Sequence, residues 1–252
     1  MNTPAKIIIT LLSIATVIAI IAGVYIHVLG GGGFSIGAKK VEEQVSLEGN
    51  PEKLSVDIDY ADVTVQQGEE LSVAYALPES MVPVITMENG TLEVKSPDNF
   101  VSIPWQINGK NQVTITIPEE SSIDLAFLKA DAGNQTIMDL DFDKLDIQGD
   151  AGNVHLQNTR AIEISVEVDA GNILLEGCAM DVLEAKADAG NLDMSDCRIE
   201  RIDAELDAGN IEAEDSSIDS GDCRTSLGNI SLSGDIGDVR TKSSVGNVSV
   251  SR

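Results

Sequence analysis

Aromatic side chains are scarce in this chain of 252 residues. Phe, Trp and Tyr together make up 3% of the residues, and one tryptophan is present. The apolar content is therefore carried by Val, Ile, Leu and Ala. A composition of this kind favours thin, layered β structure over a globular core built on large rings.

Basic residues are also few. The chain has 16 Lys and Arg against 42 Asp and Glu, so its formal net charge is −26 at pH 7. A nucleic-acid partner is excluded on this balance, because binding it requires Lys and Arg to neutralise phosphates.

Histidine and the usual catalytic motifs are nearly absent. Of the two histidines, His27 lies in an apolar run and His155 at an outward strand position, so a serine nucleophile has no base. Phosphate loops, dinucleotide fingerprints and metal-ligand clusters are missing as well. Carboxylates are abundant enough to form pairs by chance, so they do not argue for a glycosidase. The sequence predicts a non-enzymatic protein with no catalytic residues and no bound cofactor.

The N-terminus does contain a long apolar run. After a short tail of residues 1–6, residues 7–29 are apolar throughout, and 23 residues suffice to cross a bilayer as a helix. The run lacks the short core and the cleavage motif of a secretory signal. We expect one uncleaved transmembrane helix with the lipid bilayer as its partner.

The segment after this run, residues 30–44, begins with four glycines and is expected to be a flexible linker. Lys6 stands at one end of the apolar run, and Lys39 and Lys40 at the other, so the positive-inside rule barely discriminates between orientations. An acidic body without cofactor motifs favours the cell exterior. We expect a single-pass cell-membrane protein whose soluble body is extracytoplasmic.

Residues 45–120 show the alternation of half-buried strands, for example in 54–59 and 113–117. Asn89-Gly90 is a hairpin signal, because a type I′ turn needs positive φ at both positions. Residues 60–65 are a degenerate copy of a phrase that recurs further on. The region is therefore expected to be an irregular β cap that closes the first edge of a repeat stack.

Residues 121–252 repeat the phrase Asp-Ala-Gly-Asn, which becomes Ser-Leu-Gly-Asn and Ser-Val-Gly-Asn in the last two units. The Gly-Asn pairs recur every 19 residues, and after 18 at the last step. A fixed period near 20 indicates units that stack on one another. The apolar positions alternate within each unit, as Val154 and Leu156 do around His155, which is typical of short strands. The sequence predicts an all-β fold, a parallel β-solenoid with 19-residue coils, preceded by one transmembrane helix.

The Gly-Asn pair of each unit is predicted to be a structural turn. Glycine accepts positive φ without a Cβ clash, and asparagines stacked coil on coil can form an amide ladder. The predicted turn residues are Gly133, Asn134, Gly152, Asn153, Gly171, Asn172, Gly190, Asn191, Gly209, Asn210, Gly228, Asn229, Gly246 and Asn247.

The aspartate of the phrase forms a column of candidate calcium ligands, since calcium prefers oxygen ligands. These are Asp131, Asp150, Asp169, Asp188 and Asp207. The calcium-binding β-roll phrase, with its Gly-Gly-x-Gly-x-Asp turns, is absent. In the last two units the position holds Ser226 and Ser244, which suit a turn and are poor calcium ligands. A structural role is therefore favoured, with calcium as the alternative.

Three cysteines, Cys178, Cys197 and Cys223, are too few for a disulfide framework or a zinc site. Cys178 and Cys197 lie one repeat apart, so they should stack about 4.8 Å from each other. That separation admits a disulfide. The other interpretation, two small buried residues in a ladder, is favoured because free cysteine is often buried.

The Val113–Pro118 segment followed by the Asp-Ala-Gly-Asn repeats resembles the putative-adhesin β-solenoid family of membrane-anchored bacterial envelope proteins, a domain of unknown function. The resemblance covers about residues 45–252. It implies a parallel β-solenoid without known enzymatic activity, and a link to envelope stress, since some relatives sit beside envelope-stress regulators. It carries no functional residue over to this chain.

Three hypotheses follow. The first is a surface-facing adhesion or interaction module of the envelope, with an unknown protein or glycan as its partner. The second is a scaffold that forms a homo-oligomer through its C-terminal strand edge, although basic residues such as Arg240 and Lys242 on that edge could instead prevent growth. The third, a polysaccharide-active β-helix enzyme, rests on fold analogy alone.

Overall fold

The computed structural model describes residues 40–97 and 110–251. These belong to one compact unit that spans 38–252, and we call the described part the solenoid body. The predicted transmembrane run 7–29 and most of the predicted linker lie outside the described residues. Within the described ranges, no helix is both long and apolar enough to cross a membrane.

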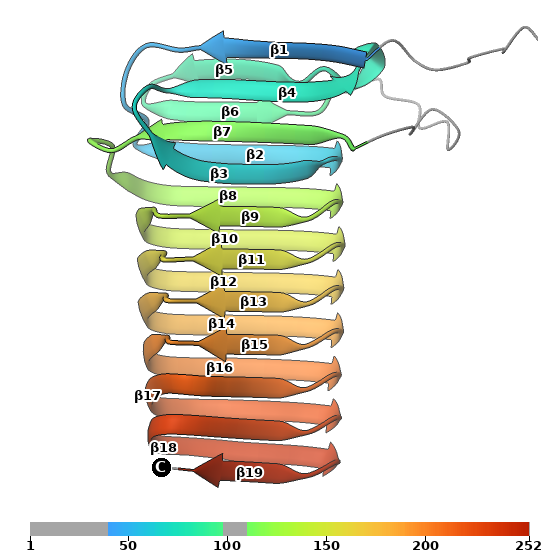
Figure 1. Ribbon diagram of the computed structural model, residues 1–252, viewed down its shortest axis with the longest axis vertical. Coiled ribbons are helices and arrows are strands. Elements are labelled where there is room, and N and C mark those ends of the chain that lie inside the picture. Colours follow the sequence, from blue (N-terminus) through green and yellow to red (C-terminus); the bar gives the residue numbers. More distant parts are fainter. Residues whose placement is uncertain (1–39, 98–109, 252) are drawn as a thin grey trace, which may run out of the picture. The chain divides into compact units, whose positions relative to one another are not determined.

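The repeats form coils of one long and one short strand, stacked in parallel (Figure 1). The long strands are β8 (Ile123–Ala132), β10 (Asp141–Ala151), β12 (Arg160–Ala170), β14 (Ala179–Ala189) and β16 (Arg198–Ala208). The short strands are β9 (Gln135–Met138), β11 (Val154–Gln157), β13 (Ile173–Glu176), β15 (Leu192–Ser195) and β19 (Val248–Ser251). In the last coils the two merge into β17 (Ile211–Leu227) and β18 (Ile230–Val245). The predicted parallel β-solenoid with coils of about 19 residues is confirmed.

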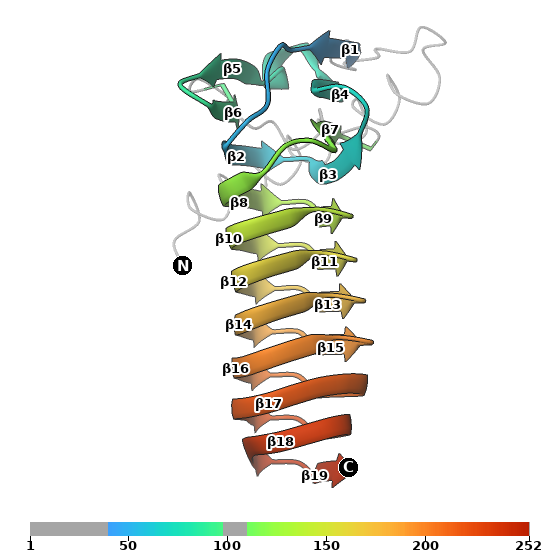
Figure 2. The same cartoon turned by 90° about the vertical axis from the view of Figure 1, so that its left-hand side faces the viewer.

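Long strands stack on long strands, and short strands on short strands, so the coils build two facing sheets (Figure 2). The register is one repeat throughout: Leu145 lies beside Ile164, and Ile164 beside Leu183. These side chains are fully buried between the sheets. The alternation of apolar and polar residues thus places one column of aliphatic side chains after another in a thin core, which explains why so few aromatic residues are needed.

A polar side chain interrupts one of the aliphatic core columns. Gln135 occupies the inward site that holds Val154 and Ile173 in the next coils, and it is 2% exposed. Its Nε2 donates to the carbonyl oxygen of Gln148 at 2.7 Å. This side chain lies in the first regular coil, where the repeats meet the N-terminal region.

The N-terminal region caps the stack. Its strands are β1 (Lys40–Ser46), β2 (Lys53–Tyr60), β3 (Asp62–Gly68), β4 (Ser72–Pro78), β5 (Val84–Glu88), β6 (Thr91–Lys95) and β7 (Gln112–Pro118). β2 pairs in parallel with β8, and β3 with β9, so both continue the two sheets. β4 then pairs antiparallel with β7 and with β1. The stack therefore begins with a mixture of parallel and antiparallel pairings.

The hairpin at Asn89-Gly90 joins antiparallel β5 and β6, with φ of 51° and 75° at the two turn residues, as predicted. Residues 60–65 also take the place expected of a degenerate repeat. Tyr60 pairs with Ala132 and Val63 with Gln135, so Asp62 stands where later coils have asparagine. The linker was predicted to extend to residue 44, but β1 begins at Lys40.

The last described coil exposes apolar side chains. Of the seven large apolar residues exposed in the described part of the chain, Val245, Val248 and Val250 lie in this coil, and Leu227 lies beside Val245 at the end of the coil before it. Val248 and Val250 occupy positions that point into the core in earlier coils, such as Val154 and Leu156. They are exposed because no further coil lies over them among the described residues.

Candidate functional site

The repeated glycines lie where each long strand turns into the short strand. A Cβ built on Gly171 would lie 1.8 Å from the carbonyl oxygen of Gly152, and one on Gly190 would lie 1.7 Å from that of Gly171. Most of these glycines also have φ between 145° and 157°. Glycine is therefore required by the close approach of one coil's backbone to the next, in addition to the turn itself.

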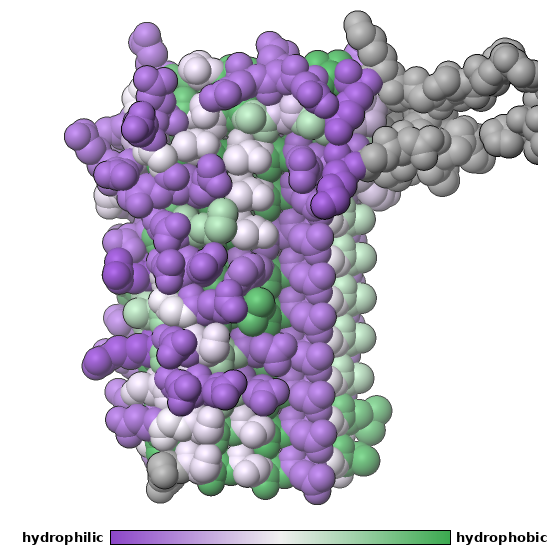
Figure 3. All heavy atoms as spheres, viewed as in Figure 1, coloured by the Kyte–Doolittle hydropathy of each residue, from purple (hydrophilic) through white to green (hydrophobic). Residues whose placement is uncertain are grey.

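The repeated asparagines form a ladder along the body. The Oδ1 of Asn153 accepts hydrogen bonds from the backbone N of Asn172 at 3.0 Å and from its Nδ2 at 3.1 Å. The same pair of bonds links the coils from Asn134 to Asn229, and Asn247 adds a backbone bond. Figure 3 shows a continuous hydrophilic stripe running along the body. These amide oxygens are used in stacking, so the ladder explains the motif without a ligand.

The aspartate column faces solvent. Asp150, Asp169 and their equivalents are exposed, while Asp131 is half-buried and its Oδ1 lies 2.8 Å from Lys129 Nζ. Within the described ranges, no three His, Cys, Asp or Glu side chains converge as a metal site would require. Calcium binding at Asp131, Asp150, Asp169, Asp188 and Asp207 remains a prediction. A melting temperature that is unchanged by excess calcium would refute it.

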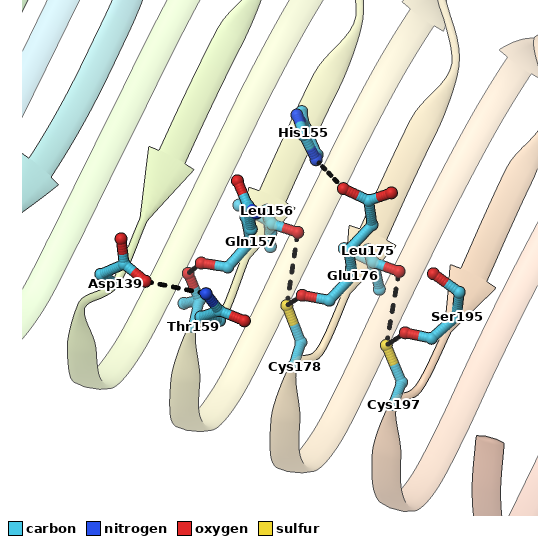
Figure 4. Close-up of polar contacts among 11 residues, drawn as sticks. Asp139, His155, Leu156, Gln157, Thr159, Leu175, Glu176, Cys178, Ser195 and Cys197 are labelled. Carbon is cyan, nitrogen blue, oxygen red and sulfur yellow. Dashed lines mark hydrogen bonds and ion pairs between the residues drawn. The ribbon is translucent and has the colours of Figure 1, made fainter. Parts of the chain in front are cut away.

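A second polar column lies at the opposite corner of the coil, and it was missed by the sequence reasoning. Thr159, Cys178, Cys197 and Ser216 occupy equivalent places, and each donates to the carbonyl oxygen two residues earlier, at 2.9–3.4 Å. Figure 4 shows the two thiols on neighbouring coils in this arrangement. The 19-residue recurrence of short polar residues was a signal that could have identified this column.

Cys178 and Cys197 are therefore part of the turn, whereas Cys223 lies inside β17 beside Ala204. All three thiols are free and buried. The hydrogen bond with Cys178, together with burial, raises the pKa of the Cys197 thiol, and burial raises the pKa of Cys223 to about 12. Because the thiolate is the nucleophile and the metal ligand, raised pKa values make these two cysteines chemically inert at neutral pH.

His155 is engaged across coils. Its Nε2 lies 2.7 Å from a carboxylate oxygen of Glu176, one coil further along (Figure 4). Other cross-coil pairs join Arg160 to Asp141 and Arg240 to Asp222. Pairs of this exposed kind contribute about 0–1 kcal/mol each to stability. The histidine thus serves the stack, and its geometry does not suggest a catalytic base.

A shallow groove of about 330 Å³ crosses the starts of β10, β12, β14 and β16. Phe142, Ala161, Ala179 and Met180 line it between the charged side chains of Arg160, Arg198, Asp181 and Glu200. This is the feature that bears on the polysaccharide-enzyme hypothesis, because it combines carboxylates with arginine. The three carboxylate residues that line it, Asp141, Asp181 and Glu200, are all exposed. A general acid, by contrast, needs an apolar pocket that keeps it protonated. The groove therefore fits binding better than hydrolysis.

A second hollow, of about 840 Å³, lies among the loops of the N-terminal cap. Glu48, Glu69, Glu70, Glu119 and Glu120 are among the residues that line it. Five carboxylates would repel an anionic ligand.

Comparison with known proteins places the chain in a family. A model of the family described as Toastrack DUF4097 matches residues 51–252. No curated protein matches the chain.

Several solved structures have a similar fold. A putative adhesin from Bacteroides fragilis NCTC 9343 is 20% identical with a TM-score of 0.62, over 84% of this chain and 96% of that one. A putative adhesin from Parabacteroides merdae ATCC 43184 is 17% identical with a TM-score of 0.54, over 87% and 98% of the two chains. One from Parabacteroides distasonis ATCC 8503 is 14% identical with a TM-score of 0.51, over 86% and 97%. At these identities the likeness shows the fold alone.

Proposed function

The chain belongs to the Toastrack DUF4097 family, and from this premise we propose that it is a non-enzymatic adhesion or interaction module of the bacterial envelope. The names of its structural neighbours as adhesins support this proposal. The proposal rests on one observation: the polar side chains of the repeat form hydrogen bonds from one coil to the next. In the described coils, asparagine amides bond one coil to the next, and Cys178, Cys197 and Ser216 add further hydrogen bonds between coils. The repeat therefore builds a surface that displays other side chains.

The proposal includes the setting of the body. Residues 7–29 anchor the chain in the cell membrane, residues 30–39 link the anchor to β1, and the body is extracytoplasmic. The apolar run and the glycines support this arrangement. A role in envelope stress belongs to the same proposal and rests on the family resemblance.

Attachment of cells tests the proposed function. Cells that produce the chain, cells that lack it, and complemented cells are compared for retention on surfaces coated with extracellular glycans or envelope proteins. We expect retention to fall in the cells that lack the chain and to return on complementation. Equal retention of all three strains on every coating would refute an adhesive role.

A second candidate is self-assembly through the last described coil. The exposed Leu227, Val245, Val248 and Val250 favour it, as does the charge of residues 234–251, which carry two acidic and two basic side chains. A neutral surface of this kind can approach a second copy, whereas the acidic coils before it repel one another. Sedimentation velocity of the full chain in mild detergent tests this. A single monomeric species at high concentration would count against it.

A further inference from the structure

Equivalent residues of successive coils form columns along the body. In three of these columns the residue type changes at the groove across β10, β12, β14 and β16. In the buried column that forms the floor, Phe142, Met180 and Ile199 are large, and Ala161 is small. The groove is hollow beside Ala161 because this side chain does not fill the space that its neighbours fill. The floor is consequently aliphatic, and Phe142, its one aromatic residue, is only 5% exposed.

The rim of the groove breaks the repeat as well. Ile162 is 54% exposed at a position that holds Asp181 and Glu200 in the following coils. An exposed isoleucine in a column of carboxylates covers no core. It adds an apolar wall to a hollow that already has an aliphatic floor.

The charges around the groove are of both signs. On one rim, Ala179 separates Arg160 from Arg198, which stand two coils apart, or about 9.6 Å. Within the described part of the chain, Arg198 has no ion pair, and Arg160 has a 3.4 Å pair with Asp141 in which both side chains are over 70% exposed. Such a loose pair is readily exchanged for a ligand. The gap at Ala179 therefore has the place and the charge to hold a carboxylate.

We propose that this groove binds a short peptide segment that combines a free carboxylate, a small aliphatic side chain and an ammonium group. The carboxylate lies between Arg160 and Arg198, the aliphatic side chain enters the hollow at Ala161, and the ammonium group faces Asp181 and Glu200. This names a partner class for the proposed interaction module and rests on that function.

A zwitterionic peptide suits this body better than an acidic polymer. The chain as a whole carries −26 charges and repels polyanions at long range, while a partner with balanced charges avoids that repulsion. An acidic glycan is the competing ligand. Sugars commonly pack on exposed aromatic faces, and Phe142 is buried, so the floor favours an aliphatic side chain.

Saturation-transfer NMR on the full chain in mild detergent tests the proposal. The probe is the tripeptide Ala-Leu-Ala with free ends, whose one ammonium group and one carboxylate balance. It is compared with the same peptide amidated at its carboxyl end and with a disaccharide of uronic acids. We expect transfer to the leucine methyl groups. Amidation should weaken binding about ten-fold, because it removes the charge-assisted contacts.

Three variants locate the binding. Arg198→Ala should weaken it about five-fold, and Ala161→Phe, which fills the hollow, should abolish it. Arg201→Ala is the matched control, since Arg201 is exposed on the same strand and does not line the groove. Melting temperatures establish that each variant is folded.

The outcomes separate this proposal from the function on which it rests. Absence of transfer from the free peptide, equal binding by Arg198→Ala and Arg201→Ala, or stronger binding of the uronic disaccharide would each overturn the peptide site. None of these results bears on cell attachment, so the interaction module would stand or fall by that separate assay.

Discussion

Asn134 donates two hydrogen bonds to one oxygen of Asp62, from its backbone N at 2.8 Å and from its Nδ2 at 3.0 Å. The two residues are 72 positions apart, yet Asp62 stands in the asparagine column of the next coil. A carboxylate suits the first position of this ladder, because the side chain there only has to accept hydrogen bonds. The cap and the repeats are thus joined by the same bond that joins one repeat to the next.

Removal of one amide from the middle of this ladder should weaken the body. Asn172→Ala deletes the acceptor of Asn191 and the donor to Asn153. We expect a loss of about 1–2 kcal/mol in the free energy of unfolding, since exposed groups regain some bonds from water. Urea denaturation measures it. Asp62→Asn keeps an acceptor oxygen and should be nearly neutral, so equal losses in both variants would contradict the ladder.

The close approach of the coils makes the turn glycines far less tolerant than their neighbours. Gly171→Ala places a Cβ 1.8 Å from the Gly152 carbonyl oxygen, so the backbone of two coils must move. We expect a loss of about 3 kcal/mol or more, or failure to fold. Ala170→Ser changes the exposed neighbour and should change stability by less than about 0.5 kcal/mol. A stable, folded Gly171→Ala protein would disprove the geometry.

Asp193 and Glu212 lie side by side on neighbouring coils. Burial, and then the charge of Glu212, raise the pKa of the Asp193 carboxyl above 3.8. A carboxyl with a raised pKa favours folding at low pH, and this contribution is lost as the pH rises through its folded value. Charged Asp193 is therefore a cost at neutral pH.

Asp193→Asn should accordingly stabilise the body at pH 7, by about 0.5 kcal/mol. The gain should shrink as the pH falls through the raised pKa, because the wild-type carboxyl is then neutral too. Glu212→Gln should give a smaller gain, because it leaves the burial of Asp193 in place, and the two gains should not add. Urea denaturation at pH 7 and below pH 4 tests this, and a constant difference at both pH values would be inconsistent with the pair.

The cysteines should not react in the folded protein. Burial raises the pKa of Cys223 to about 12, and Cys178 and Cys197 are buried in the turn column. We expect iodoacetamide at pH 8 to label none of the three before unfolding and all three after it, without reductant. Mass spectrometry counts the labels. A single label on the unfolded chain, carried by Cys223, would instead reveal a disulfide between Cys178 and Cys197.

The parallel solenoid could be predicted because its signal is periodic. Gly152, Gly171 and Gly190 recur at 19 residues, and each coil repeats the same alternation, so one spacing determines the register of the whole stack. The degenerate copy near Asp62 pairs in register with the first repeat for the same reason. Strand β1 was missed because its side chains are mostly exposed and lack alternation.

Features that arise where single residues depart from the repeat pattern could not be predicted from that pattern. The groove arises where Ala161, Ile162 and Ala179 each depart from their column, and a departure becomes visible only when three-dimensional neighbours are compared. The turn role of Cys178 was likewise hidden, since threonine, cysteine and serine share a donor but not a residue type. The membrane run at 7–29 remains a prediction.

Protease treatment of intact cells tests most directly the claim that this chain displays an interaction surface outside the membrane. With a tag at the C-terminus, we expect cleavage in the glycine segment 30–33 to release the tagged body while cytoplasmic proteins stay intact. Backbone hydrogen bonds between neighbouring coils should protect the released body from further cleavage. A body that remains cell-associated and uncut until the cells are lysed would contradict the account.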